Sequence, residues 1–167
     1  MPGQKYRESG FTLIEILIAV AILSIGASFA IPSYLDWVSR YQLREAITTI
    51  QSNLMLARMA AMNRNKVVNV NFALTSGQVT VNSLDSTNAS VLPTATMMGH
   101  VTAIDVTNSA GTFVTPGVIS FNSLGLRNGG PAALPQVVRV TNDKGQVYSA
   151  AVTPGGKVRW CLIATCS

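Results

Sequence analysis

An apolar run near the N-terminus constrains this chain more than any other feature of its sequence. Residues 11–31 hold a single charged side chain, Glu15, in 21 positions. A helix of that length is roughly 30 Å long, which matches the hydrocarbon core of a bilayer. We therefore expect a helix that spans a membrane once. Because Lys5 and Arg7 precede the run, the positive-inside tendency predicts a cytoplasmic N-terminus, with the rest of the chain across the membrane.

The ten residues before this run have the character of a removable leader. A basic segment ahead of an apolar run resembles a secretory signal, but such signals are cut after the apolar region, at small residues. Here the only sharp break, Ser9-Gly10 before Phe11, precedes the apolar run. Cleavage at this break would remove residues 1–10 and keep the helix on the mature chain, with a new α-amino group at Phe11.

Glu15 is the anomalous residue of the apolar run. A carboxylate inside a bilayer is costly and persists where it has a partner or a function. One interpretation is a side chain that snorkels to the membrane surface from near the new N-terminus. The other is that Glu15 of one copy pairs with the freed amino group of Phe11 in a neighbour and sets the axial register of a helical array.

Residues 10–15, Gly-Phe-Thr-Leu-Ile-Glu, resemble the prepilin signature of type IV pilins and type II secretion pseudopilins. The resemblance implies that a prepilin peptidase cuts between Gly10 and Phe11 and methylates the new amino group. It also implies that Glu15 acts in assembly with other pilin subunits. Pro32 fits the family too, because these helices commonly kink or unwind there. The implied location is the bacterial inner membrane, with a periplasmic head, and an extracellular pilus or pseudopilus.

A second helical pattern follows the apolar run. Apolar residues recur at alternating steps of four and three, which is the stripe of an amphipathic helix. We expect one helix to about Asn63, with residues 11–38 as the transmembrane and assembly part and residues 39–66 as an amphipathic part packed on a domain. The stripe consists of Leu43, Ile47, Ile50, Leu54, Ala57 and Ala61. The opposite face, interpreted as solvated, carries Arg40, Arg44, Arg58, Arg64 and Lys66.

From residue 67 the apolar period changes to two, and Gly, Pro and Asn turn signals separate short runs rich in Val and Ile. We predict seven strands, the last three as an antiparallel meander, with polar loops at 83–100 and 122–135. The expected fold class is α+β: a long N-terminal helix packed on an antiparallel β-rich head at 67–167, the pilin fold. The predicted strands are 68–72, 78–82, 101–106, 118–121, 136–141, 147–152 and 157–163.

Two patterns in the head resemble the GspH/FimT branch of the pilin superfamily. They are Phe-Asn-Ser-Leu-Gly at 121–125 and Gly-Lys-Val-Arg at 156–159, ahead of a terminal Cys. The resemblance implies a FimT-like minor pilin that is incorporated in, or primes, a type IV pilus. The alternative is a GspH-like minor pseudopilin of a type II secretion system.

The sequence holds no catalytic or metal-binding constellation. His100 has no carboxylate or thiol near it in the sequence, and nucleophile and phosphate-loop motifs are absent. We therefore predict no enzyme activity, no cofactor and no metal. Cys161 and Cys166 have no further Cys or His nearby to complete a zinc site, so we expect a disulfide in an exported chain, with two free thiols as the alternative.

The C-terminal quarter of the chain is basic. Five cations and one carboxylate, Asp143, give residues 126–167 a charge of +4 within a total of +5. Such a surface either binds an anion or is a solvated face. In a strand Lys157 and Arg159 share a face, while Val158 and Trp160 turn towards the core. Arg139, Lys144 and Arg127 are the predicted extensions of the surface.

Gly156-Lys157-Val158-Arg159 is similar to the Gly-Arg-x-Arg motif of FimT-like minor pilins of natural competence. The resemblance implies binding of double-stranded DNA for uptake. Lys157 departs from the motif, because lysine keeps the charge of arginine but loses its bidentate fork.

Overall fold

The computed structural model describes residues 10–97, 100–164 and 166, apart from the side chains of residues 29 and 30. Most of the predicted leader, including Lys5 and Arg7, lies outside the described residues. The chain forms two compact units, Met1–Trp37 and Val38–Ser167, which we describe one at a time. The second unit is called the head below.

The helix α1 (Leu13–Arg64) is continuous, and its predicted end near Asn63 is confirmed. The family resemblance implied a kink or unwinding at Pro32, and the helix does not unwind there. Its C-terminus forms a Schellman motif. Asn65 has a φ of 51°, and the N–H groups of Asn65 and Lys66 donate to the carbonyls of Met62 (3.3 Å) and Ala61 (3.2 Å).

The amphipathic stripe of α1 lies in the core of the head, as predicted. Every stripe residue from Leu43 to Ala61 is fully buried, and Ala46 joins them. The cations predicted for the opposite face are mostly solvated, as expected: Arg58 is half-buried, whereas the other four, Arg40, Arg44, Arg64 and Lys66, are exposed. Lys66 follows the end of α1, and its ammonium lies 3.5 Å from the carboxylate of Asp85.

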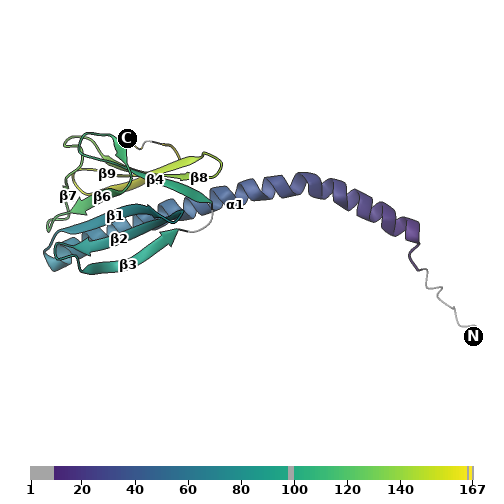
Figure 1. Ribbon diagram of the computed structural model, residues 1–167, viewed down its shortest axis with the longest axis horizontal. Helices are drawn as coiled ribbons and strands as arrows, with labels where there is room; N and C mark the ends of the chain where they lie inside the picture. Colours follow the sequence, from purple (N-terminus) through teal and green to yellow (C-terminus); the bar gives the residue numbers. More distant parts are fainter. Residues whose placement is uncertain (1–9, 98–99, 165, 167) are drawn as a thin grey trace, which may run out of the picture. The chain divides into compact units, whose positions relative to one another are not determined.

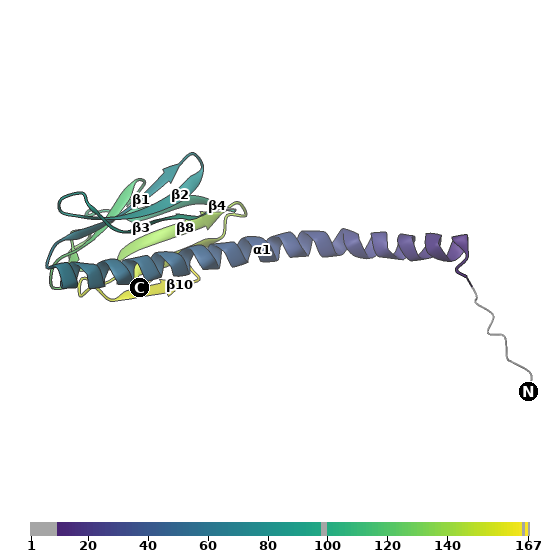
Figure 2. The ribbon, with the colours of Figure 1, turned by 90° about the horizontal axis from the view of Figure 1, so that it is seen from below.

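Within the residues that the structure describes, ten strands form two antiparallel sheets of five, which confirms the fold class (Figures 1 and 2). The first sheet has the order β3 (Ser90–Met97), β2 (Gln78–Asp85), β1 (Val68–Thr75), β6 (Gly117–Phe121) and β7 (Arg127–Asn128). The second has the order β10 (Val158–Cys161), β9 (Val147–Val152), β8 (Gln136–Asn142), β4 (Val101–Thr107) and β5 (Phe113–Val114). The predicted meander is β8–β9–β10.

One hydrophobic core joins both sheets to α1. Alternate residues of the central strands are buried, such as Val68, Val70 and Phe72 of β1, and they pack with the helix stripe in one cluster. This period-two burial is what the sequence alternation predicted. The opposite positions of β1, such as Asn69 and Asn71, are only partly buried.

The prediction of a loop at 83–100 is wrong, because this segment contains the edge strand β3. This strand pairs with β2, and Met97 alone among its residues is buried, so it lacks the apolar alternation that marks a strand. Pro93 lies at an irregular point of the register, where an edge strand tolerates a residue without an N–H donor. The expected loop at 122–135 likewise contains the two-residue strand β7. The last strand is shorter than predicted and ends at Cys161.

Candidate functional site

The N-terminal end of α1 has a capping box that involves the predicted assembly residue. The amide of Thr12 donates to Oε2 of Glu15 (3.4 Å), and the amide of Glu15 donates to Oγ1 of Thr12 (3.3 Å). This reciprocal pair satisfies two amides that a helix start leaves without partners. It also holds a negative charge at the positive end of the helix dipole. The Thr-x-x-Glu spacing could have predicted this cap.

The apolar run is suited to a hydrocarbon environment. From Leu13 onward, the described side chains of the unit Met1–Trp37 are exposed, and the helix is apolar and long enough to cross a membrane. Two hydroxyls inside the run are satisfied by the helix itself. Ser24 donates to the carbonyl of Ala21 (2.8 Å), and Ser28 donates to that of Ser24 (2.9 Å). These bonds remove a cost that lipid would otherwise impose.

The predicted DNA-binding pair lies on the hairpin between β9 and β10. Lys157 and Arg159 are both exposed and flank the buried Val158. The turn is closed by two bonds between Thr153 and Lys157: the amide of Thr153 donates to the carbonyl of Lys157 (3.0 Å), and the amide of Lys157 donates to Oγ1 of Thr153 (3.1 Å). Lys157 forms no ion pair with any residue that the structure describes.

Arg58 of α1 ties this hairpin to the loop after β6. Its Nε donates to the carbonyl of Gly125 (2.9 Å), and its Nη2 donates to that of Gly155 (3.3 Å). Gly156 is buried at φ 77°, where a Cβ atom would lie 2.1 Å from the Gly125 carbonyl oxygen. The segments 121–125 and 156–159 therefore lie together beside the guanidinium of Arg58. Arg58 belongs to this joint, which corrects its assignment to a solvated face.

Arg127 does not extend the exposed surface as predicted. Its backbone N–H donates to the carbonyl of Pro154 (3.1 Å), but its guanidinium is buried and donates to the carbonyls of Pro131 and Leu134. Burial lowers the pKa of Arg127, because the charged form loses hydration. The structure therefore assigns this cation to the support of the loop that follows it.

Two other predicted cations also lie apart from the hairpin. Arg139 shares the outer face of its sheet with Arg159, but its guanidinium pairs with Asp105 (3.1 Å) and lies 3.5 Å from the ring centroid of Phe113. Lys144 lies in the turn at the opposite end of β9, roughly 20 Å from Lys157 along the strand. The structure therefore leaves Lys157 and Arg159 as a separate pair.

The C-terminal tail is fixed by the predicted disulfide between Cys161 and Cys166. Cys166 is buried with Val137 and Ala151 on the outer face of the second sheet. The hydroxyl of Ser149 donates to the carbonyl of Ile163 (2.6 Å), which also holds the tail on this face. Reduction would free the tail and expose Val137 and Ala151. The disulfide therefore stabilises the surface beside Arg159.

Trp160 lies at the boundary of the core, whereas the sequence predicted that it turns into the core. It is half-buried and packs against the main cluster. The guanidinium carbon of Arg44 lies 5.6 Å from its ring centroid, within the range of a cation–π contact. Figure 2 shows β10 beside α1, in agreement with this contact. Arg44 is itself exposed, in agreement with its assignment to the solvated face of α1.

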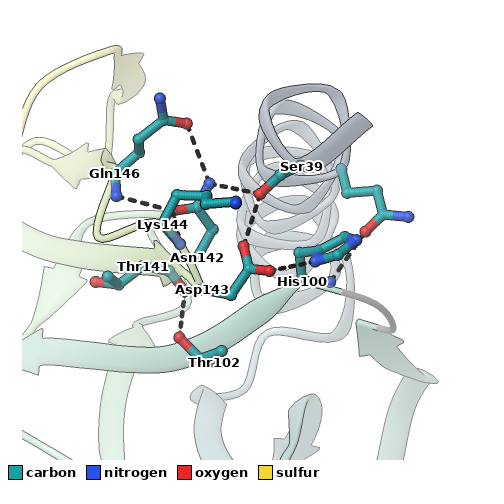
Figure 3. Close-up of polar contacts among 9 residues, drawn as sticks. Ser39, His100, Thr102, Thr141, Asn142, Asp143, Lys144 and Gln146 are labelled. Carbon is teal, nitrogen blue, oxygen red and sulfur yellow. Dashed lines mark hydrogen bonds and ion pairs between the residues drawn. The ribbon is translucent and has the colours of Figure 1, made fainter. Parts of the chain in front are cut away.

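A polar network at the other end of the meander surrounds Asp143 (Figure 3). Ser39 donates to Oδ1 of this carboxylate (2.8 Å), and Nδ1 of His100 lies 2.5 Å from Oδ2. His100 therefore has a carboxylate partner, 43 positions away in the sequence. Asn142 donates to Ser39 (2.9 Å) and to Gln146 (3.1 Å).

This network lacks the geometry of a nucleophilic triad. The carboxylate stands between Ser39 and His100, whereas a catalytic serine donates to the histidine that accepts its proton. No group of three or more His, Cys, Asp or Glu side chains that could hold a metal occurs among the described residues. The arrangement around Asp143 instead ties α1 to the turn between β8 and β9.

We expect the head to lose stability below about pH 3.8, the ordinary pKa of Asp143. Hydrogen bonds from Ser39 and then His100 hold the pKa of Asp143 below that value in the folded state. Asp143 therefore stabilises the head above the pKa that it has in the unfolded chain, and this stabilisation is lost as the pH falls through its lower pKa in the folded head. Asp85 adds to the loss, because hydrogen bonds from Thr87 lower its pKa too. The melting temperature of the head, measured between about pH 5 and pH 2, should fall less steeply for Asp143→Asn than for the unchanged chain. Parallel curves of melting temperature against pH would contradict this role of Asp143.

Comparisons with known proteins address both parts of the chain. The family described as the prokaryotic N-terminal methylation motif matches residues 5–31. The type IV major fimbrial protein FimA of Dichelobacter nodosus is 50% identical over 44 residues, which are 26% of this chain and 28% of that protein. The match thus spans little more than a quarter of the relative's length.

The head resembles solved structures at low sequence identity. The minor pseudopilin EpsH from the Type 2 Secretion System of Vibrio cholerae is 12% identical, with a TM-score of 0.51 over 72% of this chain and 96% of that one. The type IV minor pilin FimU of Pseudomonas aeruginosa is 11% identical, with a TM-score of 0.48 over 74% and 90% of the two chains, too low to add to the argument. The chain thus combines an N-terminal methylation motif with a fold that is similar to that of the minor pseudopilin EpsH.

Proposed function

We propose that this chain is a FimT-like minor pilin, anchored in the bacterial inner membrane with its head in the periplasm and incorporated in, or priming, a type IV pilus. A prepilin peptidase removes residues 1–10 and methylates Phe11. The observation that carries the assembly role is Glu15, a carboxylate held at the start of an exposed apolar helix by Thr12. In an array of such helices, this carboxylate can pair with the amino group of Phe11 in a neighbour.

The second part of the proposal is that the head binds double-stranded DNA through Lys157 and Arg159. Cations at alternate positions of an extended chain lie about 7 Å apart. A DNA strand presents one phosphate per ~3.4 Å of helix axis, so both cations can contact nearby phosphates of one strand. Arg58 and the Thr153 turn fix the hairpin backbone that carries them. Contacts of this kind are independent of base sequence and weaken as salt increases.

We expect that replacing Lys157 and Arg159 together by Gln strongly weakens retention of duplex DNA by the detergent-solubilised chain at low salt. Loss of two phosphate contacts should also reduce the slope of log K against log salt by about 2. A gel-shift titration at several salt concentrations measures both effects. The matched control is Arg40→Gln with Arg64→Gln, which removes the same charge from exposed positions of α1.

The DNA part is wrong if the unchanged chain is not retained at low salt, or if the control pair loses as much retention as the hairpin pair. Equal losses would mean that net charge alone, and no defined surface, holds the DNA. A control pair that keeps the wild-type affinity would assign the binding to the hairpin.

A minor pseudopilin of a type II secretion system, GspH-like, is the second candidate. The observation that favours it is the similarity of the head to EpsH, which extends over 96% of that chain. The two candidates differ in what deletion of the gene disrupts. Loss of surface pili and DNA uptake with normal exoprotein export supports the pilus, whereas loss of export with normal pili supports the secretion system.

A further inference from the structure

Two exposed aromatic side chains follow the apolar run of α1 within the unit Met1–Trp37. The side chains of Tyr34 and Trp37 are 63% and 60% exposed, and their ring centroids are 6.2 Å apart. Positions three apart lie on the same side of a helix, so the two rings form one small surface. Ile31 and Leu35, also largely exposed, extend the apolar surface of the helix up to this pair.

The position of this pair along α1 matches a membrane boundary. At 1.5 Å per residue, Tyr34 lies about 32 Å and Trp37 about 36 Å along the helix from Leu13. The hydrocarbon core of a bilayer is ~30 Å thick, and ~40–45 Å including the headgroup layers. A helix with Leu13 at one edge of the core therefore places both rings in the opposite headgroup layer. The charge pattern agrees, because Asp36 is the first charged residue after Glu15.

The chemistry of the two side chains suits that layer. Tyr and Trp combine an apolar ring with a polar tip, and both are enriched where acyl chains meet headgroups. We propose that Tyr34 and Trp37 form an interfacial anchor that binds the headgroup–acyl boundary of a phospholipid bilayer and sets the depth of the helix before assembly. The inference rests on the proposed membrane anchoring and adds to it a fixed depth and the residues that determine it.

The test measures the depth of Trp37 in the full chain, reconstituted in phosphatidylethanolamine–phosphatidylglycerol vesicles. Trp160→Phe leaves Trp37 as the single tryptophan. The vesicles contain lipids brominated near the headgroup, at mid-chain or at the chain end. We expect quenching by the headgroup-proximal bromines to be at least about twofold stronger than by the chain-end bromines.

A second chain provides the reference for the middle of the bilayer. It carries Leu23→Trp, with both native tryptophans replaced by Phe. Leu23 is exposed and lies about 15 Å along the helix from Leu13, so its replacement should be quenched most by the chain-end bromines. In a third chain, Tyr34→Ala in the Trp37 reporter should reduce the preference of Trp37 for shallow bromines, because one of the two interfacial rings is missing.

The outcomes separate this inference from the anchoring itself. If the Leu23→Trp chain is quenched deeply while Trp37 is not quenched at all, the helix is inserted and the interfacial anchor is wrong. Strongest quenching of Trp37 by chain-end bromines would also overturn the inference, because the pair would then lie within the core. If neither reporter is quenched, the chain does not insert, and the proposed anchoring fails together with the inference.

Discussion

Glu15→Val is expected to leave this chain in the membrane fraction while reducing its incorporation into filaments by at least about tenfold. The variant keeps the apolar run, and it even removes the charge that opposes insertion, so anchoring should persist. In the proposed array, the variant loses the partner of the neighbour's Phe11 amino group. A charge left without its partner in a buried environment costs ~3–5 kcal/mol, which is enough to disfavour the assembled state strongly. Comparison of the chain in sheared filaments and in membranes measures the effect.

The capping box requires a second variant, because Glu15 also caps its own helix. Val at this position removes the cap as well as the charge, and loss of a cap costs about 1 kcal/mol. Glu15→Gln keeps a side chain that can bond the amide of Thr12 but carries no charge. If assembly depends on the charge, the Gln and Val variants should fail alike. Wild-type incorporation of Glu15→Gln would show that the residue acts as a cap alone.

Gly156→Ala is expected to lower the free energy of unfolding of the head by about 2–5 kcal/mol, or to prevent folding. Two causes add. A Cβ atom is disfavoured at φ 77°, and it would lie 2.1 Å from the carbonyl oxygen of Gly125 and 3.0 Å from Nε of Arg58. The same carbonyl oxygen of Gly125 accepts the hydrogen bond from Nε of Arg58 (2.9 Å), so a shift of the loop after β6 would disturb that bond. Urea unfolding of the purified chain, followed by circular dichroism, gives the change.

The adjacent Gly155 provides the matched control. It is exposed, and the nearest atom to an added Cβ, Oγ1 of Thr153, is 4.0 Å away. Gly155→Ala should therefore change stability by no more than about 0.5 kcal/mol. Similar losses for the two variants would contradict the specific joint between the hairpin, Gly125 and Arg58, and would point to a general effect of stiffening the turn.

Periodicity in the sequence was sufficient to predict the parts of the fold that bury apolar faces. The steps of four and three from Leu43 to Ala61 predicted the buried stripe of α1, and alternation predicted strands such as β1 and β8. The edge strand β3 was missed because its exposed and partly buried positions do not alternate with a period of two. It pairs with β2, and its residues Val91, Leu92 and Ala95 are only partly buried where they pack against the core.

Contacts between distant residues could not be predicted in the same way. Lys157 and Arg159 share a face because they are two positions apart, and this local rule held. Arg127 carries the same charge, but its guanidinium is buried and donates to carbonyl groups of the loop that follows it. The course of that loop depends on contacts with the rest of the head. The pairing of His100 with Asp143 likewise depends on two turns brought together by the sheet. Residue type and spacing therefore predicted the local surface, whereas burial and long-range partners required the structure.

Cleavage at Gly10 and polymerisation through the helix that follows it are the central claims of the proposed function. The measurement that tests both is mass spectrometry of the N-terminal peptide of this chain in sheared filaments and in membranes, for the unchanged protein and for Glu15→Val. We predict a peptide that begins with methylated Phe11 in both fractions of the unchanged protein, and in the membrane fraction alone for Glu15→Val. A filament-borne chain that retains residues 1–10, or a Glu15→Val chain that enters filaments as efficiently as the unchanged one, would contradict the account.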